Sequence, residues 1–325
     1  MTELDSNQSA SKAAAAEKWE RDLLSRLVLA TLTEQRRARR WSVFFKSLLF
    51  LYLFALLFFA LPHKLSESGL SVGHHTALVE LDGVIAPDSD ANADNIIEGL
   101  RSAFEDKGTR GVILRINSPG GSPVQAGQIN DAIRALRAEH PNIPLYAVIT
   151  DICASGGYYV AVAADKIYAD KASLVGSIGV LMDGFGFVDT MKKLGVERRL
   201  YTAGAHKGYL DPFSPSKEDD VQHNQGMLAE IHRQFIDAVK RGRGTRLKND
   251  PDLFSGLVWT GEQGVALGLV DGLGSSDYVA RELIHEKDIV DFTPHRDFFQ
   301  RFAQRIGASA MQGMIGAFVG MPSLR

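Results

Sequence analysis

Residues 111–121, GVILRINSPGG, and residues 145–157, LYAVITDICASGG, share the pattern that decides the fold. Each stretch begins with a run of apolar, often β-branched residues and ends in small residues that include two glycines. An apolar run of this length is typical of a buried strand, and a glycine-rich turn after it is typical of the passage into a helix. Two such units predict an α/β domain built on a parallel sheet.

Short apolar runs alternate with helical patterns on both sides of these stretches. The pattern predicts strands over residues 77–81, 111–116, 145–149, 166–168 and 196–201, and helices over residues 92–104, 124–137, 155–164, 187–194, 217–240 and 275–286. The expected organisation is a cytoplasmic tail over 1–40, a transmembrane anchor over 41–62, a linker over 63–75, one folded domain over 76–287 and a C-terminal tail over 288–325. That tail could cover an apolar surface, contact a neighbouring subunit or touch the membrane.

The predicted anchor rests on a stretch from Trp41 to Leu61 whose only charged residue is Lys46. A helix needs about 20 apolar residues to cross a bilayer. Four arginines precede the stretch: Arg36, Arg37, Arg39 and Arg40. Because positive charge stays on the cytoplasmic side, the N-terminus is expected in the cytoplasm and the folded domain outside it. A cleaved secretory signal and a buried core helix are the two alternatives.

Composition excludes some classes of function. The 325 residues carry 36 Lys and Arg against 39 Asp and Glu, a net charge of −3, so no basic field favours nucleic acid as a partner. The single cysteine, Cys153, cannot form an intramolecular disulfide or a metal cluster alone. His74 and His75 are expected to be solvated linker residues, because no further ligands have suitable spacing. No metal site and no cofactor are therefore expected.

The turn over residues 117–121, NSPGG, is the first candidate site. Its glycines reach backbone dihedrals closed to other residues, so its N–H groups can face an anion or an extended peptide. A plain tight turn between strand and helix is the alternative.

Ser155 is the second candidate, at the predicted start of a helix. Serine is a favoured helix cap, which is the structural alternative. Its neighbours are small, however, and leave space for a substrate carbonyl, while the helix dipole favours developing negative charge. These features favour a nucleophile.

Several motifs taken in order resemble the signal peptide peptidase A family. They are NSPGG at 117–121, ASGGYY at 154–159, GSIGV at 176–180, GAHK at 204–207 and TGEQG at 260–264. The resemblance extends from about Thr76 to Glu286. It implies a Clp-protease/crotonase-like α/β fold of ββα units after one transmembrane helix. It also implies a serine endopeptidase with a Ser/Lys dyad that cleaves signal peptides left in the membrane.

The resemblance also implies residue roles. Ser155 would be the nucleophile, Lys207 the general base and Ser177 a residue that orients the lysine. Gly120, Gly121 and Gly156 would supply oxyanion contacts. A lysine accepts a proton only as a neutral amine, so the base needs surroundings that disfavour its charge. The alternative is that Lys207 is an exposed lysine with no catalytic role.

A Ser-His-Asp arrangement is the competing chemistry. It would need one of three histidines, His206, His140 or His232, and an acid such as Asp165 or Asp211. No motif in the sequence supports it.

The expected partners are signal peptides and other hydrophobic peptides, the membrane and further copies of the chain. The expected location is the bacterial inner membrane, with a single span and a periplasmic or otherwise extracytoplasmic catalytic domain. Two other functions remain open: a crotonase-type acyl-CoA enzyme and a non-catalytic, membrane-tethered assembly protein.

Overall fold

A computed structural model describes residue 19 and residues 35–37, 39–55 and 73–294 of the chain. Residues 39–55 are helical, and they belong to a different compact unit from residues 73–294. Among the described residues, no helix combines the length and apolarity that a membrane crossing requires. The predicted span over 41–62 is helical as far as residue 55, and its remainder lies outside the described residues. Most of the predicted C-terminal tail, from residue 295, lies outside them too.

The folded domain is built on one mixed sheet. Its strands are β1 (His75–Asp82), β2 (Thr109–Ser118), β3 (Leu145–Ala154), β4 (Lys166–Ala169), β5 (Leu174–Gly176), β6 (Val258–Thr260), β7 (Gly272–Leu273) and β8 (Ile289–Asp291). The main order is β6-β5-β3-β2-β1-β8, and β4 pairs with β3 and β7. Every pairing is parallel except the one between β5 and β6. The predicted α/β class with a parallel-rich sheet is confirmed.

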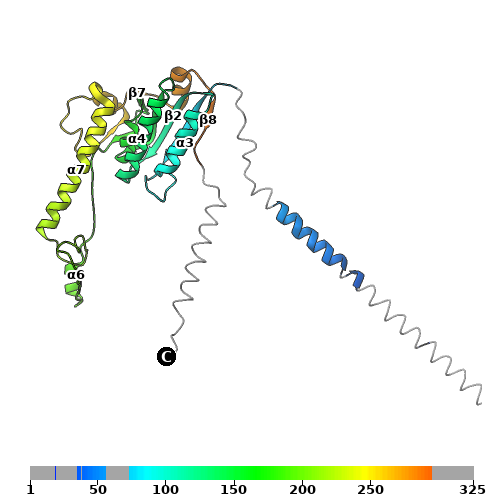
Figure 1. The fold of residues 1–325 in the computed structure, drawn as a ribbon, viewed down its shortest axis with the longest axis horizontal. Coiled ribbons are helices and arrows are strands. Elements are labelled where there is room, and N and C mark those ends of the chain that lie inside the picture. The colour runs from blue at the N-terminus through cyan, green and yellow to red at the C-terminus, as the bar shows by residue number, and fades with distance from the viewer. Residues whose placement is uncertain (1–18, 20–34, 38, 56–72, 295–325) are drawn as a thin grey trace, which may run out of the picture. The chain divides into compact units, whose positions relative to one another are not determined.

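Helices follow the strands, and all except the short helix over residues 261–267 were predicted from the sequence pattern. They are α3 (Ala93–Glu105), α4 (Pro123–Glu139), α5 (Gly156–Ala161), α6 (Val188–Lys193), α7 (Glu218–Arg243), α8 (Gly261–Leu267), α9 (Ser276–Tyr278) and the π-helix η2 (Val279–Ile284). Helices α3 and α4 pack side by side along the sheet, whereas α7 extends away from it with α6 near its N-terminal end (Figure 1).

Side chains are buried on both faces of the central strands. Val79, Leu114 and Ile149 belong to the larger core cluster, and Leu78 and Ile113 belong to a second cluster with the π-helix η2. A parallel sheet covered on both faces needs apolar residues at nearly every position of its strands. This requirement explains why the strands read as continuous apolar runs in the sequence.

Strand β3 runs further than the sequence predicts, and the extra residues place the candidate serine. Its first half pairs with β2 and β4, and its last three residues pair with β5, so that Ala154 lies opposite Gly176. The extension brings the end of β3 beside a strand that the sequence analysis did not find.

Three other expectations differ from the structure. The strand predicted over 196–201 is wrong, because these residues are exposed and form no strand. His75, predicted to be a solvated linker residue, is the buried first residue of β1 and stacks on Phe292. Strand β8 pairs with β1 beyond residue 287, the predicted end of the domain.

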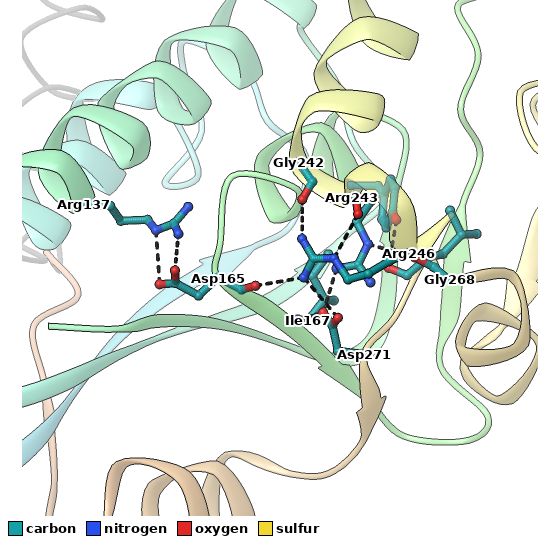
Figure 2. Close-up of polar contacts among 10 residues, drawn as sticks. Arg137, Asp165, Ile167, Gly242, Arg243, Arg246, Gly268 and Asp271 are labelled. Atoms are coloured by element: carbon teal, nitrogen blue, oxygen red, sulfur yellow. Dashed lines mark hydrogen bonds and ion pairs between the residues drawn. The ribbon is translucent and has the colours of Figure 1, made fainter. Parts of the chain in front are cut away.

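A buried ion-pair network fixes the C-terminal end of α7 (Figure 2). The Arg243 side chain, only 1% exposed, donates to Asp271 at 2.6 Å and to the carbonyl of Gly268 at 2.9 Å. Asp271 also accepts hydrogen bonds from the Ile167 N–H at 2.7 Å and from Arg246 at 3.1 Å. Because Ile167 lies in β4 and Asp271 directly precedes β7, the network joins α7 to the sheet.

Candidate active site

Ser155 occupies a sharp turn between β3 and α5. Its backbone dihedrals are φ 52° and ψ −122°, a region that residues with a side chain rarely adopt. The residue stands at the N-cap of α5, but its side chain makes no capping hydrogen bond. Its N–H donates to the Gly176 carbonyl at 2.9 Å. The capping alternative is therefore wrong, and the hydroxyl is left for another use.

The glycine turn 117–121 packs directly on this serine. A Cβ atom built on Gly120 would lie 2.8 Å from the Ser155 Cβ and 2.7 Å from the Gly156 nitrogen. A Cβ on Gly121 would lie 2.2 Å from the Ile85 carbonyl oxygen. Both glycines also have positive φ, 102° and 147°. Only glycine can therefore hold this approach.

The amides of the three candidate oxyanion glycines differ in what they contact. The Gly120 N–H donates to Ser118 Oγ at 3.1 Å, so it already has a partner inside the turn. Gly121 and Gly156 line one cavity with Ser155, and a Cβ on Gly156 would lie 3.2 Å from the Gly121 nitrogen. The Gly156 N–H is also in the first turn of α5, where helix amides lack intrahelical acceptors. The geometry favours Gly121 and Gly156 as the anion-binding pair.

The cavity beside Ser155 has a volume of about 540 Å³. Its apolar walls include Ala126 from α4, Leu181, and Ile231 and Phe235 from α7. Sequence reasoning missed the two α7 residues, although their spacing of four places them on one helix face. An apolar cavity next to a nucleophile can select the side chain of a substrate.

Ser177 lines the same cavity and has an unusual backbone as well. Its φ is 51°, and its N–H donates to the Leu257 carbonyl at 2.8 Å. His232 of α7 contacts the next carbonyl, that of Ile178, through Nε2 at 3.1 Å. The structure thus brings Ser155 and Ser177 to one cavity, as expected from the sequence.

Lys207 does not join this cavity within one copy of the chain. It is exposed and lies in the turn over residues 205–210, which contacts α7 at Asp220 and His223. The cavity meets α7 at Ile231 and Phe235. At 1.5 Å per helical residue, positions 220 and 231 are about 17 Å apart along the axis. The role of Lys207 as base stays a prediction.

Two of the three histidines named for a Ser-His-Asp site are engaged elsewhere, whereas His232 contacts the Ile178 carbonyl beside the cavity. His206 Nδ1 lies 2.6 Å from Asp220, and His140 stacks on Phe104. The two candidate acids are likewise bound: Asp165 pairs with Arg137, and Asp211 pairs with Arg198 and accepts from Ser214. Neither of these acids contacts a histidine among the described residues.

Cys153 precedes the serine by two positions but does not belong to its chemistry. The side chain is fully buried, and burial raises the pKa of its thiol well above the ordinary value. A thiol held in its protonated form is a poor nucleophile. Within the described residues, no group of three or more histidine, cysteine or acidic side chains could hold a metal ion.

A strained serine beside glycine amides and an apolar cavity is an arrangement that suits nucleophilic catalysis. Residues 137–290 match the family model described as Peptidase family S49. The match covers 154 of the 325 residues.

Three relatives show how far the likeness extends. A Na(+)/H(+) antiporter NhaA of Brucella melitensis is 51% identical over 54% of this chain and 24% of that protein. An Enterococcus faecium protein whose name assigns it to signal peptide peptidase SppA is 31% identical over 66% of this chain and 64% of its own length. The chloroplastic serine protease SPPA of Arabidopsis thaliana is 31% identical over 58% of this chain and 28% of its own length. The chain therefore spans less than two thirds of each of these relatives.

Proposed function

We propose that this chain is a membrane-anchored serine endopeptidase that cleaves signal peptides left in the membrane after preproteins are processed. The observation that carries the proposal is the strained, uncapped Ser155 in the lining of an apolar cavity. The match of residues 137–290 to peptidase family S49 and the names of two relatives support the peptidase activity. The fold would then be of the Clp-protease/crotonase-like kind.

The reaction follows from the groups around Ser155. Its Oγ attacks the carbonyl carbon of a peptide bond while a base takes the hydroxyl proton. The N–H groups of Gly121 and Gly156 hold the negative charge that develops on the carbonyl oxygen. Collapse of this intermediate breaks the C–N bond, and the amine leaves with a proton returned by the base. Water then hydrolyses the acyl-enzyme by the same path.

We assign the base to Lys207 of a neighbouring copy. Helix α7 contacts the Ser155 cavity near its middle and the Lys207 turn near its N-terminus. That separation of about 17 Å exceeds the reach of a lysine side chain within one copy, whereas a second copy can supply the amine. Ser177, in the cavity wall, would hydrogen-bond the incoming amine and orient it.

Exposed apolar side chains support such an assembly. The segment over residues 181–213 carries Phe185, Tyr201 and Leu181, whose side chains are 79%, 89% and 80% exposed. Exposed apolar side chains on the segment that also carries Lys207 support a protein interface there. A second copy is the occupant that also completes the catalytic site.

The cavity and the N-terminal segment suggest the substrate and the location. Walls formed by Ala126, Ile231 and Phe235 suit small or branched apolar side chains, which are abundant in signal peptides. An extended substrate would lie along the glycine turn. The apolar stretch 41–62 would anchor the enzyme in the bacterial inner membrane, with the catalytic domain outside the cytoplasm.

Two other functions were open from the sequence. A crotonase-type acyl-CoA enzyme would need an acidic catalytic residue, and no acidic residue is among those described as lining the Ser155 cavity. A non-catalytic assembly protein would gain nothing from the backbone strain at Ser155, which costs about 1–3 kcal/mol. Both alternatives are less favoured than the peptidase.

Labelling with a fluorophosphonate tests the proposal. The full-length chain in detergent should be labelled, and Ser155→Ala should abolish the label because the reagent modifies only an activated serine. Ser255 lines the same cavity with its hydroxyl bound to the Asp252 carbonyl at 2.7 Å. Ser255→Ala is therefore the matched control and should keep the label. Undiminished labelling of Ser155→Ala would end the proposal.

A further inference from the structure

The turn that carries Lys207 is docked on α7 by contacts on both sides of the lysine. One residue before it, His206 Nδ1–H donates to Asp220 Oδ1 at 2.6 Å. Two residues after it, the Tyr209 ring lies 6.1 Å from the ring of His223, at an interplanar angle of 77°. Asp220 and His223 are three positions apart and therefore lie on one face of the first turns of α7.

Hydrogen bonds within the turn shape it but do not attach it to the helix. The Lys207 N–H donates to the Gly204 carbonyl at 3.2 Å, and the Tyr209 N–H donates to the His206 carbonyl at 3.0 Å. Among the described residues, the hydrogen bond of His206 and the ring contact of Tyr209 connect this part of the turn to α7. These contacts therefore help to fix the place of Lys207.

The two partners of the His206 contact differ in solvent exposure. The Asp220 side chain is 13% exposed and is fixed at the start of a long helix, whereas the His206 side chain is 63% exposed. The Asp220 carboxylate thus holds the exposed imidazole of His206 in place by a hydrogen bond. Because His206 and Lys207 are consecutive, capture of the imidazole restricts the backbone from which the lysine projects.

We propose that His206, held by Asp220, is a positioning residue that directs Lys207 toward the Ser155 of a neighbouring copy. The inference rests on the proposed function, in which Lys207 is the base. A base must lie within hydrogen-bond reach of the serine hydroxyl, and a displacement of about 1 Å can cost about 100-fold in rate. The imidazole acts through the lysine and takes no proton from the substrate.

The rival role for the same pair is general base catalysis. A carboxylate bound to Nδ1 leaves Nε2 free, which is the orientation found in Ser-His-Asp sites. Asparagine separates the two roles, because its amide can donate to Asp220 in place of Nδ1–H but cannot accept a serine proton. Recovery of activity in His206→Asn is therefore expected only if His206 positions Lys207.

The test measures kcat and KM of the full-length chain in detergent with an internally quenched peptide rich in alanine and leucine. His206→Ala and Asp220→Ala should each lower kcat by about 10- to 100-fold and leave KM unchanged, because the substrate cavity lies elsewhere on α7. The double variant should be no slower than either single variant, as expected for a coupled pair. His206→Asn should recover most of kcat. His74→Ala, at an exposed histidine that contacts Arg110, is the control and should match the wild type.

Wild-type kcat in His206→Ala, or failure of His206→Asn to recover activity, would overturn the inference. Lys207→Arg separates this failure from failure of the proposed base. If Lys207→Arg is inactive while His206→Ala turns over normally, only the positioning role is lost. If Lys207→Arg is active, Lys207 is not the base and the inference falls with that assignment. Sedimentation of every variant checks that the assembly is unchanged.

Discussion

Ser155, the proposed nucleophile, also carries a local cost in stability. Its φ of 52° and ψ of −122° lie where glycine is at ease and other residues are strained by about 1–3 kcal/mol. Strain of this kind persists where the surrounding structure fixes it, and here the Gly176 carbonyl and the Gly120 turn do so. In this conformation Ser155 lines the cavity, and its side chain makes no capping hydrogen bond.

Substitutions at Ser155 should therefore separate activity from stability. Ser155→Ala and Ser155→Gly should both be inactive, since neither has a nucleophile. Ser155→Gly should be the more stable of the two by about 1 kcal/mol, because glycine adopts positive φ without a Cβ clash. Urea unfolding of both variants measures the difference. Equal stability, or a more stable alanine variant, would mean that the backbone at residue 155 is not strained.

At the scale of single residues, the sequence predicts which residue types occupy the candidate site better than it predicts the contacts that they make. The glycines at 120, 121 and 156 follow from the motif, because a close backbone approach requires them. The bond from the Gly120 N–H to Ser118 depends on how the turn closes, which no local pattern encodes. The positive φ of Ser177 likewise depends on its pairing with Leu257, a residue far along the chain.

At the scale of elements, α7 connects the sheet, the substrate cavity and the Lys207 turn. Its amphipathic pattern and length are readable from the sequence, and the predicted helix over 217–240 is confirmed by the observed Glu218–Arg243. The short strands β5 and β6 were not predicted, because three residues give no periodic signal. The cavity wall that α7 supplies could not be predicted either, since it depends on how the helix packs on the sheet.

The network of Arg243 and Asp271 should make stability depend on this junction. Burial alone would raise the pKa of Asp271, but the hydrogen bond and charge of Arg243 outweigh it and hold that pKa below its usual range. Since the folded pKa is depressed, this contribution is present above about pH 4 and is lost as the pH falls through the folded value. Asp271→Asn should therefore flatten the loss of stability below pH 4.

At neutral pH, removing the carboxylate should be costly. Asp271→Ala leaves the buried Arg243 without its partner and should lower the free energy of unfolding by about 3–5 kcal/mol. Asp277, 65% exposed and paired with Arg281, provides a matched control, and Asp277→Ala should change stability by less than about 1 kcal/mol. Urea denaturation of both variants gives the comparison. Similarly small losses of unfolding free energy in both variants would mean that the network does not stabilise the position of α7.

At the scale of the whole molecule, one copy of the chain does not bring Lys207 to the Ser155 cavity. The described domain contains the proposed nucleophile, the amides of Gly121 and Gly156 and a cavity, but the predicted base lies beside the N-terminal part of α7. The sequence motifs predict both members of the dyad without indicating whether one copy brings them together. In the proposed assembly, whether Ser155 and Lys207 meet depends on how copies pack, and no local sequence pattern predicts that packing.

Assembly should therefore be required for activity. Phe185→Ser with Tyr201→Ser removes two of the most exposed aromatic side chains of the 181–213 segment. The double variant in detergent should sediment as smaller species and lose peptide cleavage together, because apolar contacts hold such interfaces. Leu273→Ser, on the separate strand β7 and 46% exposed, should change neither property. Full cleavage by a monomeric double variant would contradict the account.

Co-expression of two inactive chains tests most directly whether the active site forms between copies. Ser155→Ala keeps Lys207, and Lys207→Arg keeps Ser155, so each variant alone should be inactive. In mixed symmetric assemblies, a site shared by neighbours receives both intact groups about one time in four, which should restore about a quarter of the wild-type cleavage rate. A mixture as inactive as its components would contradict a catalytic site built from Ser155 of one copy and Lys207 of the next.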